Sequence, residues 1–285
     1  MYADDTQLYY SCNCNELEVT DTIKDINSDL SRISNFSKTN CLKLNAEKSK
    51  FIVIGSRHNL KKLKTIQLEP IKIEKDTIER EYEVKNLGII FDEELTWTRH
   101  VNLSIAKAYG KLRHANRFKN FLDEETKWKL TETYVLSQFN YGDIILQNLS
   151  DQLQKKIQKL QNGCVRFAFG LRKYDHISEF VKNKKILNMN NRRLLHSLTL
   201  MFRIKNYKAP NYLCNRISDH TEIHNHFTRN RLNINPPFAR TKLRSMSYFV
   251  FISNKFNDLS KKIEVNGISV GIFKKKCREH LLKSQ

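Results

Sequence analysis

The chain contains little glycine and little proline, with 8 and 4 residues of these types among 285. Disordered linkers are usually rich in such residues, so long linkers are not expected, although three of the four prolines fall within 208–245. No apolar run approaches the roughly 18 residues that a membrane-spanning helix needs. Met1 leads directly into a polar, acidic segment, unlike a secretory signal. We therefore expect an intracellular protein, nuclear or cytoplasmic, with no membrane partner.

Cysteine is also sparse and irregularly placed. The six residues lie at Cys12, Cys14, Cys41, Cys164, Cys214 and Cys277. A disulfide framework would show regular, paired spacings, and none is present. The pattern predicts free thiols in a reducing compartment.

Acidic side chains are scarce only in the later part of the chain. The sequence carries 50 Lys and Arg against 30 Asp and Glu, a net charge of +20. Residues 1–98 contain 14 basic and 17 acidic side chains, whereas residues 99–285 contain 36 and 13. A uniformly lysine-rich protein would not leave its first third slightly acidic. The excess beyond residue 98 favours an anionic partner such as nucleic acid or an anionic surface.

Two adjacent carboxylates, Asp4 and Asp5, stand close to the start of the sequence. Asp tolerates turn geometry, and Tyr2 and Leu8-Tyr9-Tyr10 supply β-prone flanks, so the pattern predicts a tight strand-turn-strand hairpin. Carboxylates held at such a turn bind hard cations such as magnesium, which support two-metal phosphoryl transfer. A solvated acidic turn is the alternative, and for an isolated Asp pair it is the commoner one.

The segment Tyr2-Ala3-Asp4-Asp5-Thr6-Gln7-Leu8-Tyr9 resembles the catalytic hairpin of reverse transcriptases from jockey-like non-LTR retrotransposons, which are LINE-type elements. Two further motifs of this family follow in order. Leu42 to Lys50 is similar to a palm motif in which Asn, here Asn45, is followed three residues later by Lys. Val84 to Asp92, continued by Leu95, Trp97 and His100-Val101, is similar to the primer-grip region.

The resemblance continues to the end of the chain. Tyr141-Gly142, Leu160-Gln161 and Arg166 are similar to the thumb of the same family. Phe256-Asn257-Asp258-Leu259 and Phe273-Lys274 resemble a recurring tail. This tail departs from the usual pattern, because Phe256 replaces Trp and Ser260 replaces Pro. Five motifs in the family's order cover essentially the whole sequence.

The resemblance implies an α+β fold. Residues 1–92 would form a partial palm with a β-hairpin, a helix and short antiparallel strands. A helical thumb at 93–170 and a basic, mainly helical C-terminal region at 171–285 would follow.

Hydrophobic periodicity gives a matching outline of the elements. A helix is predicted from Leu17, Ile23, Ile26, Leu30 and Ile33, and a buried strand from Phe51 to Ile54. Further strands are predicted around Ile71, Ile73 and Ile78 and over 87–91. Beyond Leu95 the period becomes helical, with three apolar stripes that we assign to the core: Val101, Ile105, Ala108, Leu112 and Ala115; Leu153, Ile157, Leu160, Cys164 and Phe167; Leu194, Leu198, Met201 and Phe202.

The resemblance also implies roles for individual residues. Asp4 would be the ligand shared by two magnesium ions and Asp5 a supporting one, while Lys48 would protonate the pyrophosphate leaving group. Leu87 and Gly88 would bring the backbone close to the primer end, since glycine permits close approach. Two alternatives remain open: Lys48 as a solvated lysine beside Lys43 and Lys50, and Gly88 as a strand glycine that marks a bulge.

Basic residues on the predicted thumb helices are candidates for phosphate contacts that do not read sequence. The set is Lys107, Lys111, Arg113, Lys155, Lys156, Lys159 and Arg166, with Arg192, Arg193 and Arg203 as further candidates. A solubilising polar face is the alternative reading for each of them.

Cys214, His220, His224 and His226 carry ligand types that zinc prefers. A second cysteine is missing and the surroundings have the composition of a loop, so a polar loop or a phosphate contact is the favoured interpretation.

Three functions follow from these patterns. The favoured one is the C-terminal palm and thumb portion of an RNA-directed DNA polymerase, with RNA template and DNA primer as partners. We expect it to be inactive alone, because a further carboxylate, the nucleotide-selecting segment and the fingers would have to precede Met1. The alternatives are a non-enzymatic nucleic-acid-binding protein that uses the basic helical region, and an RNA-binding or structural protein in which the acidic pair is incidental.

Overall fold

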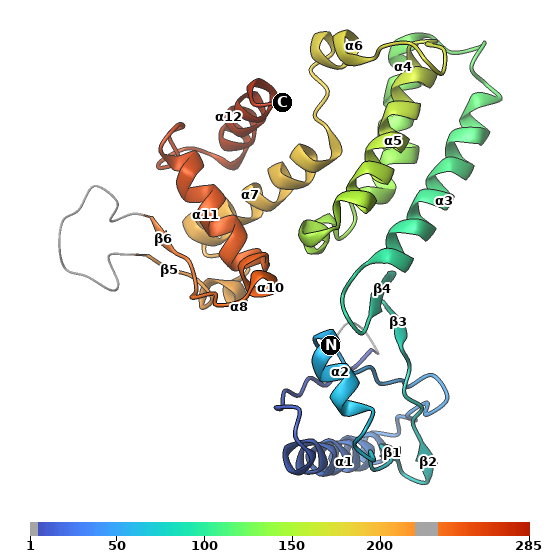
Figure 1. Ribbon diagram of the computed structural model, residues 1–285, viewed down its shortest axis with the longest axis vertical. Helices are drawn as coiled ribbons and strands as arrows, with labels where there is room; N and C mark the ends of the chain where they lie inside the picture. Colours follow the sequence, from blue (N-terminus) through green and yellow to red (C-terminus); the bar gives the residue numbers. More distant parts are fainter. Residues whose placement is uncertain (1–4, 220–232) are drawn as a thin grey trace. The chain divides into compact units, whose positions relative to one another are not determined.

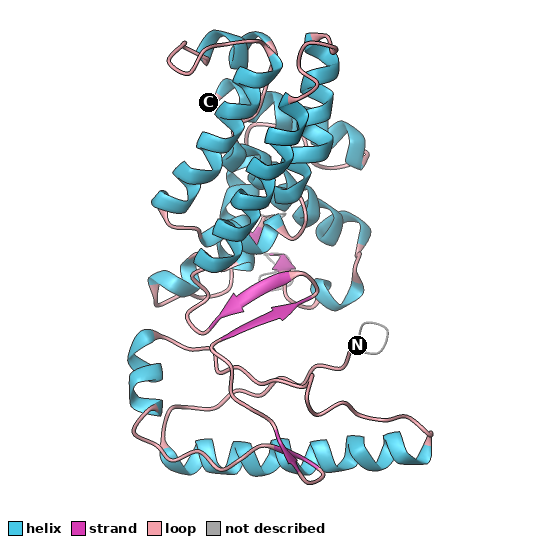
Figure 2. Ribbon diagram, turned by 90° about the vertical axis from the view of Figure 1, so that its right-hand side faces the viewer, coloured by secondary structure: helices cyan, strands magenta, loops and turns pink. Residues whose placement is uncertain are grey.

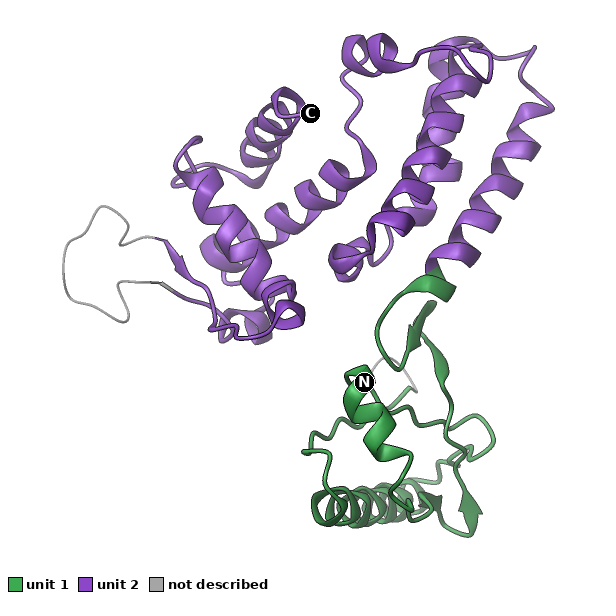
Figure 3. Cartoon of the chain, in the orientation of Figure 1, with its two compact units in different colours: residues 1–100 green, residues 101–285 purple. Residues whose placement is uncertain are grey.

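The computed structural model describes residues 5–219 and 233–285 of a mainly helical α+β protein with a few short antiparallel strands (Figures 1 and 2). The α+β class expected from the sequence is thereby confirmed. Two compact units divide the chain, residues 1–100 and residues 101–285 (Figure 3). The expected limits at 92 and 170 stay predictions. In the described ranges no helix is both long and apolar enough to cross a membrane.

Unit 1 combines a long helix, a short helix and two small hairpins. In chain order its elements are α1 (Glu16–Thr39), α2 (Arg57–Leu63), β1 (Lys72–Ile73), β2 (Asp76–Thr77), β3 (Glu83–Asn86), β4 (Ile89–Asp92) and the start of α3 (Thr98–Asn116). β1 pairs with β2 and β3 with β4, both antiparallel.

The sequence around Asn15 sets the start of α1. The Asn15 side chain accepts a hydrogen bond from the backbone N–H of Glu18 at 2.8 Å, and acidic residues fill the first turn. Val19 and Ile23 are buried in the core of this unit, with Ile26 and Leu30 packed against it, so the predicted helix is confirmed. The prediction that Leu17 belongs to the buried side of this helix is wrong, because its side chain is 80% exposed.

A single asparagine holds β1 against α1. Asn27 donates from its amide nitrogen to the carbonyl oxygen of Pro70 at 3.1 Å and accepts from the backbone N–H of Lys72 at 2.9 Å. These bonds place Ile71 and Ile73, which bracket Lys72, in the core with the α1 side chains. Burial of this apolar surface is the main favourable contribution to the stability of the unit.

The predicted buried strand at 51–54 is wrong. Within this segment only Phe51 forms a bridge, with Arg80, and Ile54 is 49% exposed. Four consecutive apolar residues do not by themselves provide a neighbouring strand, and here the chain turns into α2 soon after Gly55.

The β3–β4 hairpin closes through Leu87 and Gly88. Asn86 pairs with Ile89, so the turn has two residues, and their φ values of 45° and 84° have the signs that a type I′ turn requires. The strand expected over 87–91 therefore begins only at Ile89, and Gly88 marks a turn rather than a bulge. Leucine in the left-handed region costs about 1 kcal/mol.

The carboxylate of Asp92 organises the connection from β4 to α3. Its Oδ1 accepts from the backbone N–H groups of Glu94 at 3.2 Å and Thr96 at 2.8 Å, and its Oδ2 accepts from that of Trp97 at 2.9 Å. Leu95 and Trp97 both have positive φ values, 52° and 62°. Asp92 thus stabilises a backbone conformation that these side chains disfavour.

Unit 2 is almost entirely helical. After α3 its elements are α4 (Glu124–Leu130), η1 (Thr131–Val135), η2 (Leu136–Phe139), η3 (Asp143–Asn148), α5 (Asp151–Ala168), α6 (Ser178–Asn183), α7 (Met189–Tyr207), α8 (Asn211–Cys214), β5 (Ser218–Asp219), β6 (Ile234–Asn235), α10 (Lys242–Ser245), α11 (Tyr248–Ser260) and α12 (Val270–Lys283). β5 pairs with β6, antiparallel.

α3 and α5 lie side by side and run in the same direction (Figure 1). Near one end, the Lys156 ammonium donates to the Asn102 side chain at 3.0 Å. Farther along, Gly163 lies next to Leu112. A Cβ atom added to the glycine would lie 3.7 Å from the Cδ2 of this leucine, which is van der Waals contact. The predicted apolar stripe of α5 is buried at Leu153, Ile157, Leu160 and Cys164, whereas Phe167 is only partly buried.

A hydrophobic core in unit 2 joins α7, α11 and α12. The rings of Phe202 and Phe273 stack with centroids 4.2 Å apart, and Phe256 lies 6.0 Å from Phe273. The side chain of Asn257 accepts from the backbone N–H of Ile234 at 2.9 Å and donates to its carbonyl at 2.8 Å. The tail motif therefore has a structural role, since its two aromatic positions and its asparagine all fix the core.

All six cysteines are free, as the sequence predicts. Cys164 and Cys277 are fully buried, and burial raises the pKa of each thiol to about 12. They are packing residues.

The role of Asp92 can be tested by removing its carboxylate. We expect Asp92→Ala to lower the free energy of unfolding by about 2 kcal/mol, because three backbone N–H groups lose a charged acceptor. Urea unfolding followed by Trp97 fluorescence, in a Trp128→Phe background, measures this for unit 1. Asp76→Ala on the exposed strand β2 is the control and should stay within about 0.5 kcal/mol. An equal loss in both variants would contradict this role.

Candidate nucleic-acid interface

The acidic pair lies at the edge of the described chain. Asp4 falls outside the described residues, and Asp5 is exposed. Residues 6–13 belong to no strand, so the second strand of the predicted hairpin is absent there, and Tyr9 is 82% exposed. The described ranges hold no cluster of three or more His, Cys, Asp or Glu able to bind a metal.

One hydrogen bond connects the segment that follows Asp5 to the β3–β4 hairpin. The Gln7 amide nitrogen donates to the Asn86 side-chain oxygen at 2.8 Å, although the two residues are 79 positions apart. Gln7 comes two residues after Asp5, and Asn86 directly precedes the Leu87–Gly88 turn. The structure therefore places Gln7, which follows the acidic pair, next to the residue that precedes the turn.

Lys48 follows a local turn that Asn45 builds. The Asn45 side chain accepts from the backbone N–H of Lys48 at 3.0 Å, while its carbonyl oxygen accepts from the Ser49 hydroxyl at 2.8 Å. Asparagine favours such turns because its side chain can bond the backbone ahead of it. The Asn-x-x-Lys spacing thus has a conformational cause. Lys48 is exposed, and no ion pair joins it to Asp5 within the described residues.

The three predicted basic residues of α3 differ in their availability. Lys107 and Arg113 are exposed, and neither forms a hydrogen bond or an ion pair in the described part of the chain. Lys111 is half-buried, with its ammonium 5.1 Å from the centre of the Tyr134 ring and 3.4 Å from the Gln138 amide oxygen. Lys111 is therefore occupied within the protein, and Lys107 and Arg113 are the stronger candidates for phosphate contacts.

On α5 the predicted lysines form the exposed side of the helix. Lys155, Lys156 and Lys159 are all exposed, but Lys156 donates to Asn102. Arg166 is half-buried, and its Nη2 donates to the carbonyl oxygen of Asp175 at 3.4 Å. Lys155 and Lys159 thus remain the most available cations on this helix.

The further arginine candidates on α7 occupy different environments. Arg203 is exposed, as a phosphate contact requires. Arg192 is only partly exposed and lies 3.9 Å from Glu132, and Arg193 is 4% exposed. Burial lowers the pKa of both Arg192 and Arg193, although carboxylates nearby oppose the shift. Arg193 therefore cannot belong to an open basic surface.

The zinc alternative concerns residues that are mostly outside the described ranges. His220, His224 and His226 lie there, and only Cys214 is described. Its thiol lies 3.5 Å from the carbonyl oxygen of Pro210 and 3.8 Å from that of Ile204. The predicted grouping stays a prediction.

Sequence reasoning missed a row of glutamines beside the apolar stripe of α5. Gln161 is 2% exposed and donates to the carbonyl oxygen of Leu187 at 2.8 Å, while Gln158 accepts from the backbone N–H of Met189 at 3.0 Å. Gln154, one turn earlier, lies on the same side. Their spacing of four and three residues places them on one helical face, and this periodicity was the available signal.

Comparisons with protein-family models, with curated proteins and with solved structures found no match to this chain.

Charge removal on α3 and α5 separates available lysines from occupied ones. We expect Lys107→Gln and Lys159→Gln each to weaken binding of the full chain to a primer–template and to reduce the slope of log affinity against log salt by about 1, the effect of one lost phosphate contact. Lys111→Gln should change the slope far less, because Tyr134 and Gln138 already hold its ammonium. Fluorescence anisotropy at increasing salt measures all three.

The matched control for this series is Lys24→Gln, which removes an exposed charge from α1 in unit 1. It should leave both affinity and slope unchanged. Equal effects from Lys24, Lys111 and Lys159 would show that net charge alone, rather than this surface, determines binding.

Proposed function

We propose that this chain is the palm and thumb portion of a reverse transcriptase, an RNA-directed DNA polymerase of the non-LTR retrotransposon type. Unit 1 would carry the metal-binding carboxylates and the primer-facing turn. Unit 2 would hold the backbone of an RNA template and DNA primer. The single observation that carries the proposal is the hydrogen bond from Gln7, two residues after Asp5, to Asn86, the residue before the hairpin turn.

The chemistry of polymerisation explains why this hydrogen bond matters. Two-metal transfer acts on the primer 3′-hydroxyl, so the metal ligands and the element that positions the primer end must lie close together. The turn at Leu87 and Gly88 follows Asn86 directly, and Leu87 is 42% exposed. A two-residue turn with glycine lets a nucleic-acid strand approach the backbone closely.

Magnesium suits the donor set that the proposal assigns. Asp4 and Asp5 supply carboxylate oxygens, and magnesium is commonly held by one or two carboxylates together with substrate phosphates. When bound, the metal would neutralise charge on the transferred phosphoryl group. Two adjacent carboxylates provide too few ligands to hold two metal ions firmly, so nucleotide addition by this chain alone is not expected. Lys48 would supply a proton to the leaving pyrophosphate.

Unit 2 supports the proposal through exposed cations in a strongly basic region. Lys107, Arg113 and Lys159 have no protein partner in the described ranges, so they can contact phosphates without breaking an internal interaction. Contacts of this kind give affinity and orientation without reading the base sequence.

The exposed cations of unit 2 favour a second candidate, a non-enzymatic nucleic-acid-binding protein that uses this unit. In that case binding would depend on salt but not on Asp4 or Asp5. The third possibility, a structural protein with an incidental acidic turn, predicts no binding at all.

Metal-directed cleavage distinguishes these functions even if the chain does not polymerise. With Fe²⁺ in place of magnesium and a reductant present, we expect the bound primer–template to be cut within a few nucleotides of the primer 3′ end. The double variant Asp4→Asn/Asp5→Asn should lose the localised cuts, because its ligands for the metal are gone. Sequencing gels of end-labelled primer locate the cuts.

The control is Asp21→Asn, which removes an exposed carboxylate from α1. It should cleave like the unaltered chain. Tight binding with scattered cleavage that ignores Asp4 and Asp5 would favour the non-enzymatic binder and overturn the polymerase assignment.

A further inference from the structure

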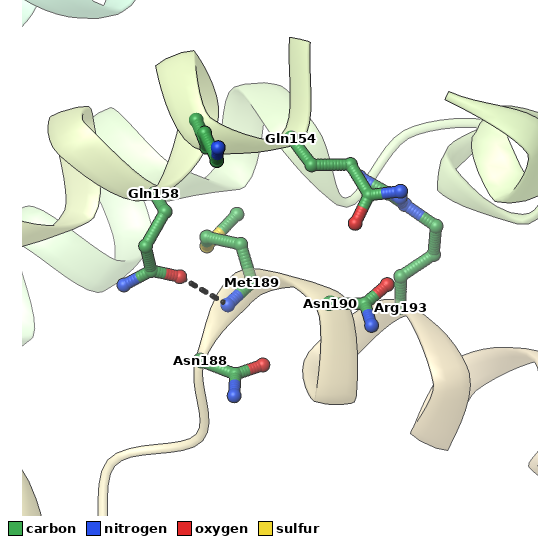
Figure 4. A pocket seen from close by; sticks show the side chains of 7 residues that line it. Gln154, Gln158, Asn188, Met189, Asn190 and Arg193 are labelled. Carbon is green, nitrogen blue, oxygen red and sulfur yellow. Dashed lines mark hydrogen bonds between the residues drawn. The ribbon is translucent and has the colours of Figure 1, made fainter. Parts of the chain in front are cut away.

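A pocket of about 230 Å³ lies between α5 and the first turns of α7 (Figure 4). From α5 it is lined by Gln154, Lys155 and Gln158, and from α7 by Asn188, Asn190 and Arg193. Of the lining residues in the described part of the chain, Met189 is the only apolar one and none is a carboxylate. Drug-sized pockets occupy about 300–1,000 Å³, so this space suits a smaller group.

Arg193 is the unusual member of this set. It is 4% exposed, and its Nε and Nη1 atoms are buried without a hydrogen-bond partner among the residues that the structure describes. A buried guanidinium with unpaired N–H groups is costly, because both its charge and its donors lose their hydration. In Figure 4 its side chain extends from α7 toward Gln154 on α5. An anionic hydrogen-bond acceptor at this position would compensate both the charge and the unpaired donors.

The protein groups around Arg193 do not supply such an acceptor. The negative charge of Asp143 acts on Arg193, but Oδ2 of Asp143 lies 2.5 Å from Nδ1 of His196, and Asp143 forms no hydrogen bond with the arginine. Gln158 uses its oxygen for the backbone N–H of Met189, and Asn188 uses its own for that of Asn191. The amide oxygens of Gln154 and Asn190 also line the pocket, but they are neutral and form no hydrogen bond with Arg193, so the charge of the guanidinium is not compensated there.

Two further features favour a negative charge at this place. Lys155 is exposed at the pocket and can turn its ammonium toward a bound group. The pocket also adjoins the N-terminal end of α7, a 19-residue helix whose dipole is positive at that end. Both add to the buried arginine.

We propose that this pocket binds a phosphate group, held by the guanidinium of Arg193 and the ammonium of Lys155. Phosphate oxygens accept two parallel hydrogen bonds from a guanidinium and can compensate its charge. The phosphate can come from a nucleic-acid backbone or from free inorganic phosphate. The site does not depend on the proposed polymerase function, because free phosphate alone reports on it.

The test is isothermal titration of the full chain with inorganic phosphate at constant ionic strength. We expect saturable binding with one site. Lys155→Gln should weaken it about tenfold, the effect of one charged contact. Lys182→Gln, an equal charge change on the exposed surface of α6, should leave it unchanged. No binding, or equal weakening by both lysine variants, would overturn the proposal.

A second variant addresses Arg193 itself. Arg193→Met should abolish phosphate binding and should leave the melting temperature in phosphate-free buffer equal or higher, because an unpaired buried charge is removed. Phosphate should raise the melting temperature of the unaltered chain but not of this variant. A lower melting temperature together with unchanged phosphate binding would show that Arg193 is only structural.

Competition then identifies the source of the phosphate. If a backbone phosphate occupies the pocket, inorganic phosphate should weaken primer–template binding by the unaltered chain more than by Lys155→Gln. If the pocket takes free phosphate, nucleic-acid affinity should not respond to phosphate at constant ionic strength in either protein. Both results support a phosphate site, and they remain informative if the polymerase assignment fails.

Discussion

The buried hydrogen bond from Gln161 to the carbonyl oxygen of Leu187 is the interaction on which the organisation of unit 2 depends. It satisfies a backbone group just before α7 begins, and Gln158 does the same for Met189 one step later. With these groups satisfied, α7 can start against α5 and carry its apolar side toward α11 and α12. The same approach of α5 and α7 creates the pocket that contains Arg193. One helix therefore sets both the core and the candidate anion site.

The helices could be predicted from the sequence, because apolar residues at helical spacing give a strong local signal. α1, α3, α5 and α7 all lie where the periodicity places them. The errors fall where a distant partner decides the outcome. Phe51 to Ile54 looks like a strand but has only one bridge, and Leu17 fits the stripe of α1 but faces solvent. Propensity and spacing contain no information on which neighbour is present.

The sequence also does not predict which charged side chains of the candidate site are exposed. In the sequence, Lys111 looks like Lys107 and Arg193 looks like Arg203. In the structure, the Lys111 ammonium lies over the Tyr134 ring and Arg193 is nearly fully buried. Only the fold tells which cations remain available. It also gives conformational roles to two asparagines: Asn45 builds the turn before Lys48, and Asn257 holds Ile234 next to the aromatic core. Such spacing reflects local architecture as well as chemistry.

Helix α5 has three faces of different composition. Leucine and isoleucine side chains face the core, glutamines face α7, and lysines lie on the exposed side. Each face keeps its place only because successive residues turn by about 100°. Insertion or deletion of one residue in this helix would rotate everything beyond it, sending lysines into the core and leucines into solvent. The length of α5 is therefore under stricter constraint than the identity of most of its exposed residues. Variation in this segment is expected as exchanges of side chains at fixed length.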